Sequence, residues 1–155
     1  MAVALSIEVK NNASPAMRRM LAQLQDRTVP NRMVGIELFS WVQRNFAAQG
    51  ALGGGWVPLK PATVAAKAKG GWSPMPLIRT GNLRNSFAGF GDAQVAGVGA
   101  QASFGVDYAR VHQEGAPEKN IPARPMLPPA EVAKDIWNRV YEDFIDKLIA
   151  KEGLR

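Results

Sequence analysis

The segment NRMVGIELFSWVQRNFAAQ, residues 31–49, decides the fold, because it carries apolar side chains at helical spacing over its whole length. These side chains form two adjoining rows, Val34, Leu38 and Trp41 in one and Gly35, Phe39, Val42 and Phe46 in the other. Together the rows make a wide apolar stripe, which is typical of a helix packed on a core. Burying each large side chain stabilises the folded state by roughly 1.5–3 kcal/mol. The segment predicts a core helix that ends at Gly50.

A second long helix is predicted close to the C-terminus. Pro128-Pro129 opens it, because proline is favoured at the first helical position. One face carries apolar side chains at i, i+4 spacing, namely Val132, Ile136, Val140, Phe144 and Leu148, flanked by Trp137, Tyr141 and Ile145. Gly153 is the expected end of this helix.

The first thirty residues predict a strand followed by a helix. Alternating apolar residues at positions 3–9 are typical of a half-buried strand. Ser14-Pro15 predicts an N-cap followed by proline at the first helical position. The apolar face of this helix consists of Met17, Met20, Leu21 and Leu24. Pro30 either interrupts the helical pattern or begins the next helix.

Strand patterns return after Leu83. Residues 86–90 and 94–99 predict a hairpin turned at Gly91-Asp92, while residues 104–111 are compatible with a strand or a short helix. Pro122 and Pro125 push the residues before them into extended conformation. The sequence therefore predicts one α+β domain over residues 1–155. In it, a small antiparallel sheet packs against two or three amphipathic helices.

Residues 50–76 predict a long Gly-rich arm. Two glycine clusters, residues 53–55 and 70–71, bracket a short helix-capable run at residues 62–69. Trp56 and Trp72 stand at the two ends of the arm. Glycine loses much backbone entropy on ordering, so we expect a flexible arm that becomes ordered on docking. Trp56 is the possible exception, because its segment could tuck under the main helix.

The positive charge is concentrated in one part of the chain. The net charge is +6, and residues 38–91 contain six basic residues and no Asp or Glu. The remaining residues carry equal numbers of both signs. This asymmetry favours an anionic partner, either nucleic acid or an acidic protein surface. A soluble loop that happens to lack acids is the alternative.

Residue types for catalysis or metal binding are scarce. The chain has no cysteine and a single histidine, His112. Hydrolysis by His112 with Asp107 or Glu114 is a minor alternative to a histidine that bonds locally. No nucleophile elbow, phosphate-binding glycine loop or membrane-length apolar run is present, and residues 1–10 do not resemble a secretion signal. We therefore expect no catalytic, cofactor or metal site, and a soluble protein made in a reducing cytoplasm.

Four short elements in a fixed order make the sequence recognisable. Trp56-Val57-Pro58-Leu59 comes first, followed by Thr80-Gly81-Asn82-Leu83 with Ser86. Tyr108-Ala109-Arg110-Val111-His112-Gln113-Glu114-Gly115 is third, and Pro122-Ala123-Arg124-Pro125 is last. This succession, over residues 26–127, resembles the phage virion morphogenesis family of tail-completion proteins. The family usually has Phe where this chain has Met126, a volume-tolerant exchange. The arm between Thr63 and Leu77 varies among such proteins, so the resemblance implies nothing about its contacts.

The resemblance implies a subunit of a tailed bacteriophage that acts in tail completion or head–tail joining at the neck. It also implies a homo-oligomeric ring, most simply a hexamer, with the tail terminator, tail tube or connector as neighbours. The expected location is the virion, with assembly in the host cytoplasm, and no catalytic residues are known for the family. DNA in the channel is a further possible contact. We expect the interface or DNA-facing residues to be Lys60, Lys67, Lys69, Arg79, Arg84, Trp56, Trp72 and Arg124. The alternative function is a stand-alone nucleic-acid-binding module that uses the basic arm.

Overall fold

The computed structural model describes residues 15–87 and 104–154. Within these ranges the chain is helical, and its elements follow one another in the order α1 (Pro15–Gln25), α2 (Thr28–Ala47), η1 (Ala51–Gly53), α3 (Pro61–Lys69), α4 (Asn82–Asn85), α5 (Ala109–Glu114), η2 (Pro117–Lys119) and α6 (Ala130–Lys151).

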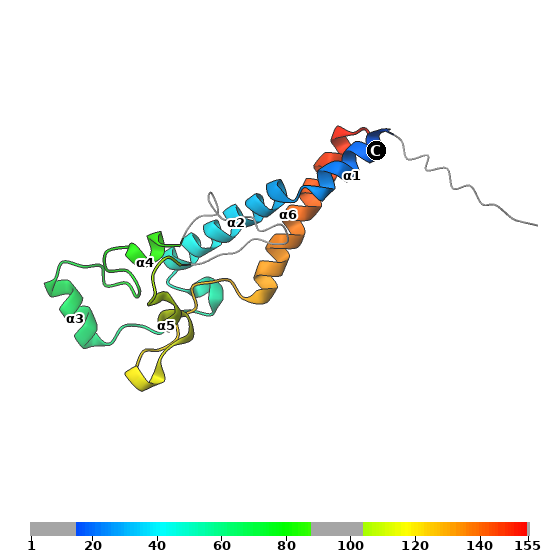
Figure 1. The fold of residues 1–155 in the computed structure, drawn as a ribbon. Coiled ribbons are helices and arrows are strands. Elements are labelled where there is room, and N and C mark those ends of the chain that lie inside the picture. Colours follow the sequence, from blue (N-terminus) through cyan, green and yellow to red (C-terminus); the bar gives the residue numbers. More distant parts are fainter. Residues whose placement is uncertain (1–14, 88–103, 155) are drawn as a thin grey trace, which may run out of the picture.

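The core forms where α2 and α6 lie side by side (Figure 1). Both apolar stripes predicted from the sequence are confirmed, because every residue of both stripes is buried or half-buried. The buried cluster contains Val34, Trp41, Val42, Phe46, Trp56, Leu83, Phe87, Ala109, Met126, Ile136 and Val140. Residues from outside the two long helices thus close the core at one end, and they include the first tryptophan of the arm.

Two asparagines of α2 lie inside this core. Asn31 is 1 % exposed, and its Oδ1 accepts a 2.6 Å hydrogen bond from the hydroxyl of Tyr141 on α6. Asn45 is fully buried, and its Nδ2 donates to the carbonyls of Pro125 and Met126 at 3.3 and 3.5 Å. Buried amides need such partners, because a buried polar group without one costs about 1–3 kcal/mol. Both asparagines therefore tie α2 to particular points of the C-terminal half.

The N-terminal helix α1 lies at the opposite end of the molecule from α3 and α5 (Figure 1). It has no buried residue and packs against the end of α6. Arg19 and Gln23 both bond the carboxylate of Glu152, at 2.8 and 3.2 Å. Pro30 lies in the first turn of α2, so it belongs to the start of the second helix rather than interrupting the first. The strand expected at residues 3–9 and the cap at Ser14 lie outside the described residues.

The expectation of an α+β fold with a small antiparallel sheet is wrong. The described residues contain no sheet, only two isolated antiparallel bridges, Phe87 with Phe104 and Ala116 with Ile121. Ser86, the expected first residue of the hairpin, instead caps α4, and the rest of that hairpin past Phe87 lies outside the described residues. The ambiguous stretch at residues 104–111 divides into the bridge at Phe104 and the beginning of α5.

The expected arm at residues 50–76 has two different halves. Its first half is bound to the core, since Trp56 is only 7 % exposed and stacks edge-on against Phe46 of α2, with ring centroids 5.1 Å apart. Its second half carries α3, which matches the predicted helix-capable run and contains no buried residue. α3 lies at the end of the molecule farthest from α1 (Figure 1). The possible exception at Trp56 is thus confirmed, while flexibility of the α3 half remains a prediction.

Candidate functional site

The first and last of the four sequence elements bind each other through two reciprocal hydrogen bonds. The indole Nε1 of Trp56 donates to the carbonyl of Pro125 at 2.7 Å. In return, Nε of Arg124 donates to the carbonyl of Val57 at 3.0 Å. The two elements are far apart in the chain, so these bonds fix the start of the arm to the proline-rich segment before α6.

The third element holds the same proline-rich segment from the other side. The backbone N–H of Arg124 donates to the carbonyl of His112 at 2.7 Å. The side-chain oxygen of Gln113 accepts from the backbone N–H groups of Met126 and Leu127, at 2.7 and 3.2 Å. Gly115 has a φ of +82°, and a Cβ there would lie 2.8 Å from the backbone nitrogen of Ala123. Only glycine allows so close an approach in that conformation.

The second element begins with a left-handed glycine. Gly81 precedes α4 with a φ of +85°, a left-handed conformation that favours glycine. Leu83 is 4 % exposed and joins the core, while Ser86 Oγ donates to the Leu83 carbonyl at 2.8 Å. The turn therefore anchors α4 to the core and leaves Thr80 and Asn82 exposed beside it.

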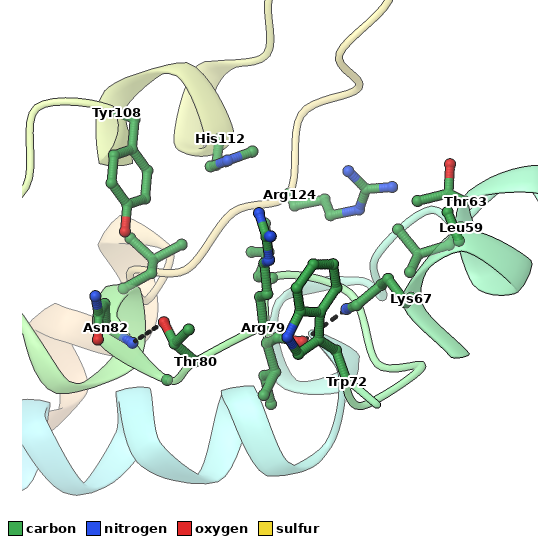
Figure 2. A pocket seen from close by; sticks show the side chains of 15 residues that line it. Leu59, Thr63, Lys67, Trp72, Arg79, Thr80, Asn82, Tyr108, His112 and Arg124 are labelled. Atoms are coloured by element: carbon green, nitrogen blue, oxygen red, sulfur yellow. Dashed lines mark hydrogen bonds between the residues drawn. The ribbon is translucent and has the colours of Figure 1, made fainter. Parts of the chain in front are cut away.

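All four elements contribute to one open cleft of about 740 Å³ (Figure 2). The cleft is lined by Leu59, Thr63, Ala66, Lys67, Trp72, Leu77, Ile78, Arg79, Thr80, Gly81, Asn82, Leu83, Tyr108, His112 and Arg124. A volume of this size lies within the range of roughly 300–1,000 Å³ that is usual for ligand sites. The recognisable residues of the sequence are therefore not scattered, because they build and surround a single concave surface.

One wall of the cleft depends on Lys67 of α3. Its ammonium donates to the carbonyls of Met75 and Ile78, both at 2.6 Å. Between these acceptors Leu77 has a φ of +58°, a conformation that costs a non-glycine residue about 1–3 kcal/mol. Beside this wall the guanidinium of Arg79 stacks on the ring of Trp72, 3.6 Å from its centroid. Lys67 thus bonds α3 to the following loop, whose Leu77 and Ile78 pack against the core.

The cleft is cationic. Its lining includes Lys67, Arg79 and Arg124 and contains no Asp or Glu. Arg124 is only 7 % exposed, and it belongs to none of the salt bridges formed among the described residues. Burial lowers the pKa of Arg124 from its ordinary value, as expected for a cation without a counter-charge. Arginine nevertheless remains protonated, so a buried positive charge faces the cleft uncompensated.

His112 shares this environment. Burial, followed by the charge of Arg124, lowers the pKa of His112. Its Nδ1 is buried, and no described residue forms a hydrogen bond with it. Burial and the charge of Arg79 likewise lower the pKa of Lys67. Each of these shifts favours the less positively charged form. Burial is the main cause, and repulsion from the neighbouring arginine adds to it at His112 and Lys67.

The eight residues expected at an interface fall into three groups. Lys67, Trp72, Arg79 and Arg124 line the cleft, and Trp56 is buried in the core outside the lining. The exposed Lys60 and Lys69 lie at the two ends of α3 and outside the lining, as does the half-buried Arg84. Tyr108, His112 and Asn82 also line the cleft but were absent from the expected interface, although they belong to the recognised elements.

Nothing in the described residues assembles a catalytic or metal-binding group around His112. Glu114 pairs with Arg110 at 3.0 Å, and Asp107 is not among the residues of the cleft. No group of three or more possible metal ligands occurs in residues 15–87 and 104–154. In the same ranges, every helix is too short or too polar to span a bilayer.

Comparison with known proteins identifies the family. No curated protein matches the chain, and no solved structure matches it. A family model does match residues 9–148, which is most of the sequence and includes every element that lines the cleft, and that model describes the phage virion morphogenesis family. The chain therefore belongs to the phage virion morphogenesis family, and its role lies in the assembly of a bacteriophage particle.

Proposed function

We propose that this protein is a tail-completion subunit that acts in head–tail joining at the neck of the phage. It forms a homo-oligomeric ring, most simply a hexamer, and contacts the neighbouring tail terminator, tail tube or connector. Its function is structural rather than catalytic. The cationic cleft is the observation that carries the proposal. The recognisable residues of the family build this cleft, and α3 lies beside it.

The α3 helix supports a docking role because none of its residues is buried in the described part of the chain. Only Lys67 among its residues is half-buried. Lys60 and Lys69, at its two ends, are exposed and therefore available to a neighbour. A helix gains most of its stability in proteins from packing, so an isolated nine-residue helix is favoured once a partner covers it.

The stand-alone nucleic-acid module loses its main support. Binding single strands through aromatic side chains needs exposed ring faces. Trp56 is buried against Phe46, and the Trp72 ring already carries the Arg79 guanidinium on one face. The basic residues of the arm can still attract phosphates, but its two tryptophans do not offer a pair of free ring faces for stacking.

Complementation of a phage that lacks this gene tests the proposed function. We expect particles without the protein to contain filled heads and separate tails. The double variant Lys60→Glu with Lys69→Glu should fold and yield the same unjoined particles, because like charges brought together at an interface cost several kcal/mol. Lys67 is left unchanged, since its ammonium is bonded internally.

The matched control reverses two exposed charges outside the arm, Arg32→Glu with Lys134→Glu. This control should support normal infection. Normal infectivity from a folded Lys60→Glu and Lys69→Glu variant would show that the exposed charges only aid solubility. A reconstruction of the virion with one copy of the protein per particle would refute the ring.

A further inference from the structure

We propose that the cleft receives an acidic segment of a neighbouring virion protein, in which an Asp or Glu flanked by apolar residues pairs with Arg124 and Arg79. This inference rests on the proposed structural role and names the chemistry of the partner. It follows from the charge, the burial and the lining of the cleft.

The first step is the state of Arg124. The residue is only 7 % exposed, it lines the cleft, and no carboxylate pairs with it within the described residues. Among the described residues, only its Nε has an acceptor, the carbonyl of Val57. A buried charge without a counter-ion is unfavourable, whereas a carboxylate matches the planar fork of a guanidinium with two parallel bonds. The free protein thus holds a site that an incoming carboxylate would complete.

The second step is the preorganisation of the neighbouring cations. Arg79 lies against Trp72, which limits the conformations of its side chain, and Lys67 is fixed by its two carbonyl acceptors. In Figure 2 the side chains of Lys67, Arg79 and Arg124 come from three separate segments around the same space. Side chains that are already fixed lose little entropy on binding, which favours affinity.

The third step decides between a peptide and DNA. Apolar side chains share the lining with the cations, among them Leu59, Leu77 and Ile78. Apolar side chains beside a carboxylate would cover this surface, whereas a phosphate backbone has none to offer. A DNA duplex is convex and would reach the exposed Arg79 but not Arg124 at the cleft wall. The lining therefore fits an amphipathic peptide better than nucleic acid.

The test is site-specific photo-cross-linking in cells that assemble the phage. A photoreactive residue replaces Thr63, which lines the cleft, or the adjacent Ala62, which is exposed on α3 but does not line it. We expect the probe at Thr63, and not the probe at Ala62, to capture one segment of a phage protein that contains an Asp or Glu between apolar residues. Changing that acid to its amide should lower the yield by about 10- to 100-fold.

Variants of the cleft provide the second readout. Arg79→Gln and Arg124→Met should each lower the cross-link yield to a similar extent, while Arg84→Gln, outside the lining, should leave it unchanged. Free Arg124→Met should melt no lower than the unaltered protein, because removing an unpaired buried charge offsets the lost bond to Val57. A merely structural Arg124 would instead give a clearly lower melting temperature. If Arg124→Met does not fold, the inference that the Arg124 charge is uncompensated is wrong. Arg79→Gln and the amide variant of the partner then test whether a carboxylate binds in the cleft.

Other outcomes overturn the proposal directly. Cross-links to DNA, a captured segment without a carboxylate, no capture from Thr63 in assembling particles, or an unchanged yield in folded Arg124→Met would each do so. The proposed function fails separately, if phage without the gene joins heads and tails normally. If phage carrying Arg124→Met joins heads and tails normally while the gene deletion does not, the proposed function stands and the proposed role of the cleft is refuted.

Discussion

Replacing Lys67 by Met should release α3 without unfolding the domain. The change removes two charge-assisted hydrogen bonds, to the carbonyls of Met75 and Ile78 at 2.6 Å. Such bonds contribute about 1.5–3 kcal/mol each when well shielded. Lys67 is only partly buried, so we reduce their sum by half, to about 1.5–3 kcal/mol in total. No residue of α3 is buried, so little else opposes its opening.

Amide hydrogen exchange measures this loss where it occurs. At about 1.4 kcal/mol per factor of ten, the amides of α3 should exchange roughly ten- to a hundredfold faster in Lys67→Met. Amides of α2 and α6 should keep their rates, because their stability depends on the buried core. The melting temperature should stay nearly constant. Lys69→Met is the matched control, since this exposed lysine on the same helix has no hydrogen bond among those described.

Two results would refute this reasoning. Equal exchange rates in Lys67→Met and Lys69→Met would show that the two carbonyl bonds do not hold the arm. Loss of cooperative melting in Lys67→Met would show that α3 is an integral part of the domain. If the amides of α3 exchange slowly in the unaltered protein, the argument requires that they exchange fast in Lys67→Met.

Three other substitutions test the interior. Gly115→Ala should lower the free energy of unfolding in a denaturant titration by at least about 2 kcal/mol, because the new Cβ meets the backbone of Ala123 at a positive φ; a neutral result would refute the close approach. Burial lowers the pKa of His112 in the folded protein, so the unfolded chain binds the proton more tightly and the unaltered protein loses stability as the pH falls below about 6.5. His112→Gln should reduce this loss. An unchanged slope of melting temperature against pH would contradict the prediction. Tyr141→Phe should cost about 1–3 kcal/mol of unfolding free energy by leaving buried Asn31 without its donor, and replacing Asn31 by Ala in addition should recover part of the loss, which a double-mutant cycle would detect.

The long helices were predictable because their apolar spacing records which face is buried. In α2 and α6 the stripes extend over several turns, so a local pattern and the tertiary packing agree. The strand expectation failed at the start of the hairpin, where the pattern was short. Ser86 begins an apolar run, yet the left-handed Gly81 starts a helical turn whose hydrogen bonds reach Ser86. A few alternating residues cannot show which of these local structures prevails.

The site was predictable in part for a similar reason. The order of the recognised elements indicated that Trp56 and Arg124 matter, but not that each donates a hydrogen bond to the other's segment. Such pairings join positions far apart in the chain, and no periodicity links them. The sequence also did not separate Lys67 from the exposed Lys60 and Lys69. The carbonyl partners of Lys67 lie in an aperiodic loop, which no sequence pattern connects to the lysine.

The positive charge of residues 38–91 therefore serves two physical roles that a formal count treats alike. Lys60 and Lys69 are exposed, so their charges act on whatever approaches α3 and are screened by salt. Lys67 and Arg79 are engaged by backbone carbonyls and an indole ring, so they shape the cleft wall. The absence of acids beside them has different consequences in the two places. At the exposed positions the absence of acids strengthens the attraction for an anionic partner. In the cleft it leaves Arg124 without a carboxylate of its own chain that would compete with a carboxylate of the partner.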